Sequence, residues 1–329
     1  MVRRIGGYIG AGVTDLSAST NVGGATGIWD VIQQNFYKLK SEWPYYGEVN
    51  VTGGNIAEAL EPGNGYKYHT FTNPGSLIID NGSKNVDILV VAGGGSGGTG
   101  YYGGGGGAGG LIYYPNFTIN AGVYPITVGL GGTASTASNG GPSTFGSSSD
   151  TNTHFVALGG GFGGPRTVDA QPGGSGGGVG YPWPGVAASG TQTTDPTIPT
   201  ISRTYGYGNN GGTPAYGAGG GGATLAGYPG DNGGGGTGYV NAAFDGPLIG
   251  IPALNPYNGA FAGGGAGGAY PGASSGPGGS GVGGEGGTPA SPNGKNAVQY
   301  TGSGGGGGWD NGAPGGAGAQ GIVVIRYAA

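Results

Sequence analysis

The chain has 329 residues, of which 92 are glycine and only 8% are charged, and its formal net charge is −5. It has no cysteine, which excludes a disulfide framework, thiolate zinc sites and a cysteine nucleophile. The acidic balance lacks the basic patch that nucleic-acid binding requires, and no apolar run approaches the length of a membrane-spanning helix.

Residues 1–45 are predicted to form an N-terminal attachment or oligomerisation segment, and residues 46–65 a linker. Arg3-Arg4 before an apolar stretch faintly resembles a signal peptide, but the glycines that follow and Asp15 interrupt the apolar region. We therefore expect a protein that is made in the cytoplasm and assembled later.

Within this segment, helical spacing of apolar residues predicts an α-helix over 27–43. Thr26 can cap its start and Pro44 stops it. The apolar stripe either packs on its own domain or serves in attachment and oligomerisation, for example in a homotrimer, because an isolated helix of this length needs a partner surface. The stripe consists of Ile28, Ile32, Phe36, Leu39 and Trp43.

The next region alternates apolar and polar residues and predicts an antiparallel β base. Asn81-Gly82 is a strong two-residue hairpin signal that would return residues 76–79 into 86–91. A turn is also predicted at 120–122. The predicted strands are 66–72, 76–79, 86–91, 111–119, 123–128, 154–158 and 321–327.

The strand 86–91 runs into Gly93-x-Gly95-x-x-Gly98, the spacing of a dinucleotide-binding loop. In a chain so rich in glycine this match is expected by chance. No helix can open after it, and no acidic residue occurs between Asp87 and Asp150. The glycines therefore indicate something other than nucleotide binding.

Beyond residue 90 the glycine runs recur in pairs, each pair enclosing a short segment. Lacking Cβ atoms, such runs can form extended threefold polyglycine-II helices that hydrogen-bond side by side. We predict a mainly β and polyglycine-II fold over 66–329, with about ten glycine segments inserted into the β base. The runs are 93–98, 103–110, 159–164, 173–178, 217–222, 233–238, 263–268, 278–287, 302–308 and 315–321.

The chain leaves the β base before the first pair of glycine runs and returns to it afterwards, so the short segment inside each pair is predicted to lie at the far tip. The longer connections 179–216, 239–261 and 288–301 are predicted to lie at the base or flanks. The tip turns are rich in aromatic residues, which either cover the ends of the lattice or contact a ligand. The candidate receptor-binding residues are Tyr101, Tyr102, Arg166, Asp169, Tyr228, Asp231, Tyr270, Trp309 and Asp310.

Catalysis finds little support. His69 and His154 both fall in predicted strands, and no serine or carboxylate spacing suggests a triad. We expect no enzyme activity, no cofactor and no metal site.

The alternation of glycine runs with short variable turns resembles the tail-fibre tip adhesins of T-even-type bacteriophages. The motifs VDILVVAGGGSGG, GGGGGAGGLIYYPNFTINAGVYPITVGLGG and GIVVIRY are similar to the glycine-rich domain of predicted phage tail proteins, notably those of cyanophages. The resemblance implies a virion tail-fibre adhesin that displays loops to a bacterial surface glycan or outer-membrane protein and binds other virion proteins. The chain departs from the adhesins in its substantial β base and long middle connections.

Two other interpretations stay open at this point. One is a structural virion protein, such as a decoration or connector, without a receptor. The other is an ice-binding or matrix protein, for which regular threonine or alanine arrays would be required and are not seen.

Overall fold

The computed structural model describes residues 8–10, 27–29, 49–150, 153–166, 168–181, 186–192, 206–213, 216–230, 233–272, 274–310 and 312–329. The chain divides into two compact units, Met1–Asn50 and Val51–Ala329. No helix among these residues is long and apolar enough to cross a membrane.

In the first unit the described residues form a two-stranded antiparallel sheet of β1 (Tyr8–Gly10) and β2 (Gly27–Trp29). The prediction of a helix over 27–43 is therefore wrong at its start, because Gly27–Trp29 is extended and pairs with Tyr8–Gly10. Isoleucine and tryptophan favour strands, and glycine is a poor helix former. Ile28 lies in β2, whereas Ile32, Phe36, Leu39 and Trp43 lie outside the described residues.

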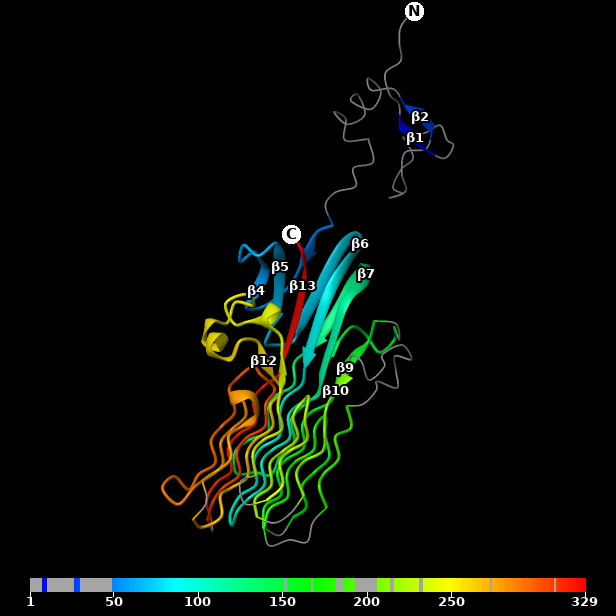
Figure 1. The fold of residues 1–329 in the computed structure, drawn as a ribbon. Helices are drawn as coiled ribbons and strands as arrows, with labels where there is room; N and C mark the ends of the chain where they lie inside the picture. The colour runs from blue at the N-terminus through cyan, green and yellow to red at the C-terminus, as the bar shows by residue number, and fades with distance from the viewer. Residues whose placement is uncertain are drawn as a thin grey trace, which may run out of the picture. The chain divides into compact units, whose positions relative to one another are not determined.

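The second unit contains a nine-stranded sheet in which every pairing is antiparallel, with the order β4-β5-β13-β6-β7-β8-β9 (Figure 1). Short β3 and β10 pair with β6 and β7. The predicted strands 66–72, 154–158 and 321–327 are confirmed as β5, β9 and β13. The strands are β3 (Val51–Thr52), β4 (Ala57–Leu60), β5 (Tyr66–Phe71), β6 (Gly75–Val91), β7 (Leu111–Thr127), β8 (Ser143–Phe145), β9 (Phe155–Ala157), β10 (Gly206–Tyr207) and β13 (Ile322–Ala328).

Two of these strands depart from the predicted turns. Asn81-Gly82 does not form a hairpin that pairs 76–79 with 86–91, since both halves of β6 pair with β7. Gly82, with φ of 67°, instead lies in an irregularity where the register shifts between Ile79 and Ser83. The turn predicted at 120–122 likewise lies inside β7. A glycine with positive φ is suited to such a bulge, which bends the ribbon without ending either strand.

The predicted linker over 46–65 also changes. Val51 pairs with Ile79, and Ala57 pairs with Thr70, so part of this segment belongs to the sheet. Val51 and Ala57 are buried, and that burial holds their strands against the edges of β6 and β5.

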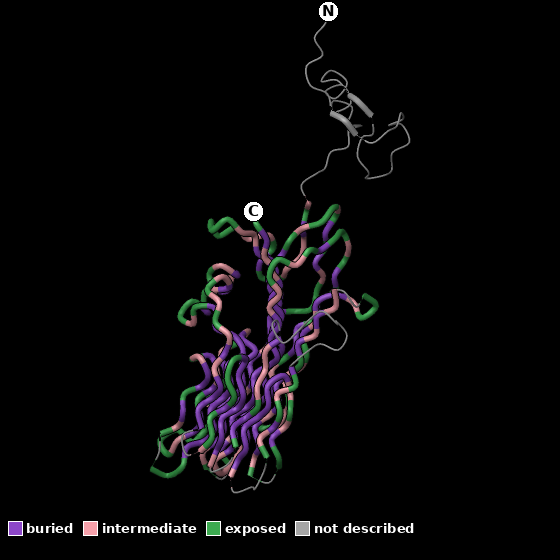
Figure 2. The backbone as a smooth tube through the Cα atoms, turned by 45° about the vertical axis from the view of Figure 1, so that its right-hand side comes forward, coloured by how far each residue is buried: buried purple, intermediate pink, exposed green. Residues whose placement is uncertain are grey.

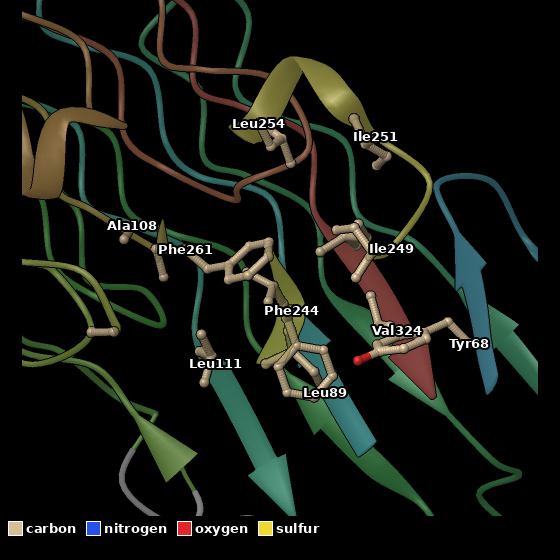
Figure 3. Packing of buried hydrophobic residues seen from close by; sticks show 14 residues of the cluster. Tyr68, Leu89, Ala108, Leu111, Phe244, Ile249, Ile251, Leu254, Phe261 and Val324 are labelled. Atoms are coloured by element: carbon tan, nitrogen blue, oxygen red, sulfur yellow. The ribbon is translucent and has the colours of Figure 1, made fainter. Parts of the chain in front are cut away.

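A hydrophobic core covers one face of the sheet (Figure 3). The segment 239–261 folds over this face as β11 (Tyr239–Val240), η1 (Ala242–Phe244), η2 (Pro252–Tyr257) and β12 (Ala260–Phe261). Its position at the base agrees with the prediction. The core contains Tyr68, Leu89, Val91, Ala108, Leu111, Ala223, Phe244, Ile249, Ile251, Leu254, Phe261, Ala262, Ile322 and Val324.

The glycine segments form a lattice held by backbone hydrogen bonds, and Gly103–Gly110 lies at its centre. Successive amides of this segment point in three different directions, and every third amide donates to the same neighbouring segment. The amides of residues 103, 106 and 109 donate to residues 308, 305 and 302, and those of 104, 107 and 110 donate to 164, 161 and 158. The amides of 105 and 108 donate to 218 and 221. A three-residue period in all directions is the hydrogen-bonding pattern expected of packed polyglycine-II helices.

The carbonyls of the same segment complete the packing. They accept from segments 92–98, 173–178 and 263–268, so the central segment is enclosed on all sides by parallel and antiparallel neighbours. Adjacent members of that surrounding shell bond to one another as well, which makes the arrangement hexagonal. Figure 2 shows that buried residues run through the glycine segments while the turns at their free end are exposed or half-buried.

Close packing explains the glycine requirement. A methyl group at Gly105 would overlap the carbonyl of Gly265, and one at Gly220 would overlap the carbonyl of Gly106. Alanine is accepted at Ala108 and Ala218, both fully buried, where the backbones leave room. The Gly93–Gly98 motif enters this lattice directly instead of opening a helix.

All the predicted glycine runs belong to the lattice, and mixed-composition segments join it at its outer side. Within the predicted connection 179–216, residues 186–192 and 208–213 pair with the segment 173–178 and with each other. Residues 292–298 likewise pair with 302–308 and 313–317. These connections therefore lie on the flanks of the lattice, one of the two positions predicted for them. An outer segment can turn its side chains to solvent, so it does not need to be glycine.

Candidate functional site

The turns at the free end of the lattice, farthest from the sheet along the glycine segments, bring aromatic residues from distant parts of the chain together. Gly98 leads out to this end, and Gly103 leads back. The segments 158–164, 262–268 and 302–308 run antiparallel to Gly103–Gly110 and therefore reach the same end. The alternating directions of these segments place the turns between them at the free end, as predicted. These turns carry Tyr101, Tyr102, Arg166, Tyr270 and Trp309.

Tyr102 is the centre of a ring cluster. Its ring centroid lies 5.8 Å from that of Tyr181, 6.0 Å from Tyr216 and 5.7 Å from Tyr270. Tyr216 also contacts Tyr181 at 4.5 Å and Tyr270 at 4.1 Å. Tyr102 adopts a positive φ of 46°, which is unusual for a bulky residue and is held by its surroundings. We call Tyr101, Tyr102, Tyr181, Tyr216 and Tyr270 the tip tyrosine cluster.

Tyr181 and Tyr216 are functional candidates that the sequence pattern does not reveal. Both lie in the connection 179–216, which the spacing of the glycine runs places at the base or flanks. The backbone amide of Tyr181 donates to the carbonyl of Tyr102 at 3.2 Å and fixes that segment at the free end. The signal that could have found them is their place beside Gly180 and Gly217, at the ends of glycine runs.

Charged groups flank the cluster. The guanidinium of Arg166 lies 4.5 Å from the ring centroid of Tyr101, within cation–π range. Burial, together with the nearby Tyr270 hydroxyl and the Asp310 carboxylate, raises the pKa of Tyr102 above its ordinary value. Tyr102 therefore keeps its proton at neutral pH and remains a hydrogen-bond donor.

Trp309 is placed next to the cluster through its backbone. Its carbonyl accepts from the Tyr102 amide at 3.0 Å, and its own amide donates to the carbonyl of Pro292 at 2.8 Å. The indole Nε1 is buried and has no hydrogen-bond partner among the residues that the structure describes. Because a buried, unpaired donor cannot reach an approaching ligand, Trp309 fits a covering role at this end better than direct contact.

The remaining candidates lie apart from the ring contacts. Tyr228 is 51% exposed, and its backbone bonds to Gly219 and Gly234 near the free end. Asp169 is exposed in the turn after Arg166. Asp231 lies outside the described residues.

The two histidines lie in the β part of the chain and not at the tip. His69 is buried in β5, with Nδ1 2.7 Å from the Gly53 carbonyl and Nε2 3.2 Å from the Tyr327 hydroxyl. Burial lowers the pKa of His69. Among the described residues, no group of three or more histidine, aspartate and glutamate side chains could hold a metal ion.

Comparison with known proteins agrees with this architecture. A protein family described as a glycine-rich domain matches residues 69–328, which include most of the sheet and the whole lattice. The chain belongs to this glycine-rich domain family. A search of curated proteins found no match.

Proposed function

We propose that the protein is a bacteriophage virion component, a tail-fibre or receptor-binding adhesin that displays the tip tyrosine cluster to a bacterial surface receptor. The observation that carries the proposal is the convergence of tyrosines from turns far apart in sequence on the free end of a backbone-packed lattice. Rigid aromatic side chains give large contact area at low conformational-entropy cost.

The lattice supports this role because it holds both ends of each tip turn in place. Every turn emerges from hydrogen-bonded segments, so its ends cannot move independently. Sequence can then vary in the turns while the glycine segments stay constant, which suits a surface that must match a receptor. The receptor would be a cell-surface glycan or an outer-membrane protein, and other virion proteins would bind the N-terminal unit.

A second candidate is a structural virion protein, such as a decoration or connector, without a receptor. The buried indole nitrogen of Trp309 favours it, as does the packing of the tip rings on one another. In such a protein the aromatic side chains would only shield the ends of the lattice from water.

Removal of the exposed tip groups separates the two. Arg166 and Tyr270 are exposed, and Tyr101 is half-buried, so Tyr101→Ala, Arg166→Ala and Tyr270→Ala can be combined without opening the lattice. We expect particles carrying the triple variant to lose adsorption to host cells while assembling normally. The control is Leu130→Ala, at a side chain that is 69% exposed on the side of the lattice. Normal adsorption of the triple variant would exclude the adhesin and leave the structural role.

A further inference from the structure

A second surface, on the side of the lattice near the sheet, has the properties of a small-molecule binding site. A cavity of about 470 Å³ opens there over the segment 206–210, with residues 190–192 on one side and 223–226 on the other. Its size lies within the range of about 300–1,000 Å³ found for ligand sites. Since Tyr207 pairs with Leu111 in the sheet, this cavity lies at the opposite end of the lattice from Tyr102 (β10 in Figure 1).

One end of the cavity is an aromatic ring that is held in place from behind. The ring centroid of Tyr207 lies 5.1 Å from that of Tyr239, which in turn lies 5.9 Å from Tyr113. Tyr113 packs edge-on against buried Phe244. This row of rings fixes Tyr207 before any ligand arrives, so little conformational freedom is lost on binding.

The side-chain amides supply hydrogen-bonding groups of both kinds. The Asn209 amide nitrogen donates to the carbonyls of Gly222 and Ala223 at 2.9 and 2.8 Å, which fixes its oxygen as a free acceptor. The Asn210 amide oxygen accepts from the Gly190 amide at 2.9 Å, which leaves its NH₂ group as a donor. Gln192, only 2% exposed, is held between the Leu158 amide and the Val156 carbonyl.

The floor and walls are small and uncharged. Gly206 and Gly208 line the cavity without side chains, and Ala223 and Ala226 carry only methyl groups. None of the described residues that line the cavity is charged. Among the described residues that line the cavity, an apolar ligand would meet no large aliphatic side chain, and an ionic ligand would meet no counter-charge. A ligand with one ring face for Tyr207 and hydroxyl groups for the amides fits all of these properties.

We propose that this lateral cavity binds a neutral saccharide, with Tyr207 stacking on a sugar ring and Asn209 and Asn210 bonding its hydroxyl groups. The site is independent of the tip tyrosine cluster and would add a carbohydrate contact at the opposite end of the lattice.

The test uses the full chain on an array of neutral and anionic bacterial oligosaccharides, followed by calorimetric titration of the neutral ones that bind. Ala226→Trp fills the cavity from an exposed position, whereas Leu225→Trp adds the same bulk one residue away at a side chain outside it. We expect Ala226→Trp and Tyr207→Ala each to weaken neutral-saccharide binding by about tenfold or more, and Leu225→Trp to leave it unchanged.

Further variants identify where any binding occurs. Tyr101→Ala at the tip should not alter binding at the lateral cavity. Replacement of residues 193–205, which join residue 192 to residue 206 in sequence, by a glycine–serine linker should preserve it. Binding to anionic glycans alone, no binding to any neutral glycan, equal affinity of Ala226→Trp and Leu225→Trp, or loss of binding with the linker variant would each overturn the proposal.

Discussion

The sheet and the glycine lattice of this protein both form a packed interior, but the sheet does so with large side chains and the lattice with backbone. The sheet is closed by large side chains such as Leu89, Phe244 and Val324, which bury apolar area on one face. The lattice has only small side chains in its interior, such as Ala108, Ala218 and Ser175, and its segments touch mainly through peptide groups. In the sheet, stability follows from the volume of side chains; in the lattice, it follows from their absence.

The comparison teaches that the same kind of mutation should have opposite effects in the two regions. Removing atoms from the sheet leaves a cavity, whereas adding atoms to the lattice separates backbones and breaks hydrogen bonds along several neighbours at once. The lattice also explains how a chain with this much glycine can be ordered. Each glycine loses much backbone entropy on folding, and hydrogen bonds to neighbours on all sides offset that loss.

The largest expected effect is at the centre of the lattice. Gly105→Leu places a branched side chain where even a methyl group would overlap the Gly265 carbonyl. We expect a loss of more than about 4 kcal/mol, so that the variant fails to give soluble folded protein. Expression and circular dichroism are the measurements. Gly122→Ala in β7 is the control, because its new methyl group would meet only the Tyr124 ring at 3.5 Å or more. A folded Gly105→Leu protein would contradict the lattice.

In the sheet, truncation of a buried side chain is expected to leave a cavity. Leu89→Ala removes a fully buried side chain from the hydrophobic core and should cost about 2–5 kcal/mol in free energy of unfolding. Denaturant titration measures it. The exposed Val123→Ala, at a side chain that is 64% accessible, should change stability by less than about 0.5 kcal/mol. Equal costs at the two positions would show that Leu89 does not belong to a packed core.

Two neighbouring glycines, Gly234 and Gly235, should differ in how much stability an alanine substitution costs. At Gly235 a methyl group would overlap the carbonyl of Gly264, whereas at Gly234 the nearest atom, the Pro277 carbonyl oxygen, would lie 3.6 Å away. Gly235→Ala should therefore cost about 1–3 kcal/mol, and Gly234→Ala should be close to neutral. Thermal unfolding of the pair is the measurement. Gly100→Ala is a poorer control, because Gly100 has a φ of 73° that strains any other residue.

The smallest expected effect is the acid sensitivity that His69 gives to the sheet; the central segment of the lattice, Gly103–Gly110, has no titratable side chain. Burial lowers the pKa of His69, so the unfolded chain takes up a proton below about pH 6.5 while the folded protein resists it. Stability should therefore fall as the pH drops below about 6.5, by at most about 1.4 kcal/mol per pH unit. His69→Gln should flatten this slope between pH 5 and 6.5, as measured by urea titration at each pH. A slope unchanged by His69→Gln would assign the sensitivity to other groups.

Much of the architecture follows from the sequence because its two signals are strong. The run of β-branched apolar residues in 321–327 predicts β13, and dense glycine in 103–110 predicts the centre of the lattice. The outer segments are harder to predict. Residues 186–192 and 292–298 carry valine, serine, lysine and asparagine, because their side chains can face solvent, and composition then gives no sign that their backbones join the lattice.

Part of the candidate site also cannot be predicted from the positions of the glycine runs. The spacing of the glycine runs predicts that 179–216 lies at the base or flanks, so it gives no sign that Tyr181 and Tyr216 lie beside Tyr102 at the tip. The hairpin signal at Asn81-Gly82 is misleading for a related reason. A local turn pattern cannot reveal that a third segment, β7, pairs with the residues on both sides of it.

Amide hydrogen exchange tests most directly whether backbone packing makes the interior. The amides of Gly104 to Gly110 are each hydrogen-bonded to a neighbouring segment of the lattice, and Val90 lies in the buried sheet. Both sets should exchange equally slowly, through global unfolding alone. Rapid exchange of the glycine amides at the rates of an unstructured peptide, with Val90 still protected, would show that the glycine segments are not a packed lattice.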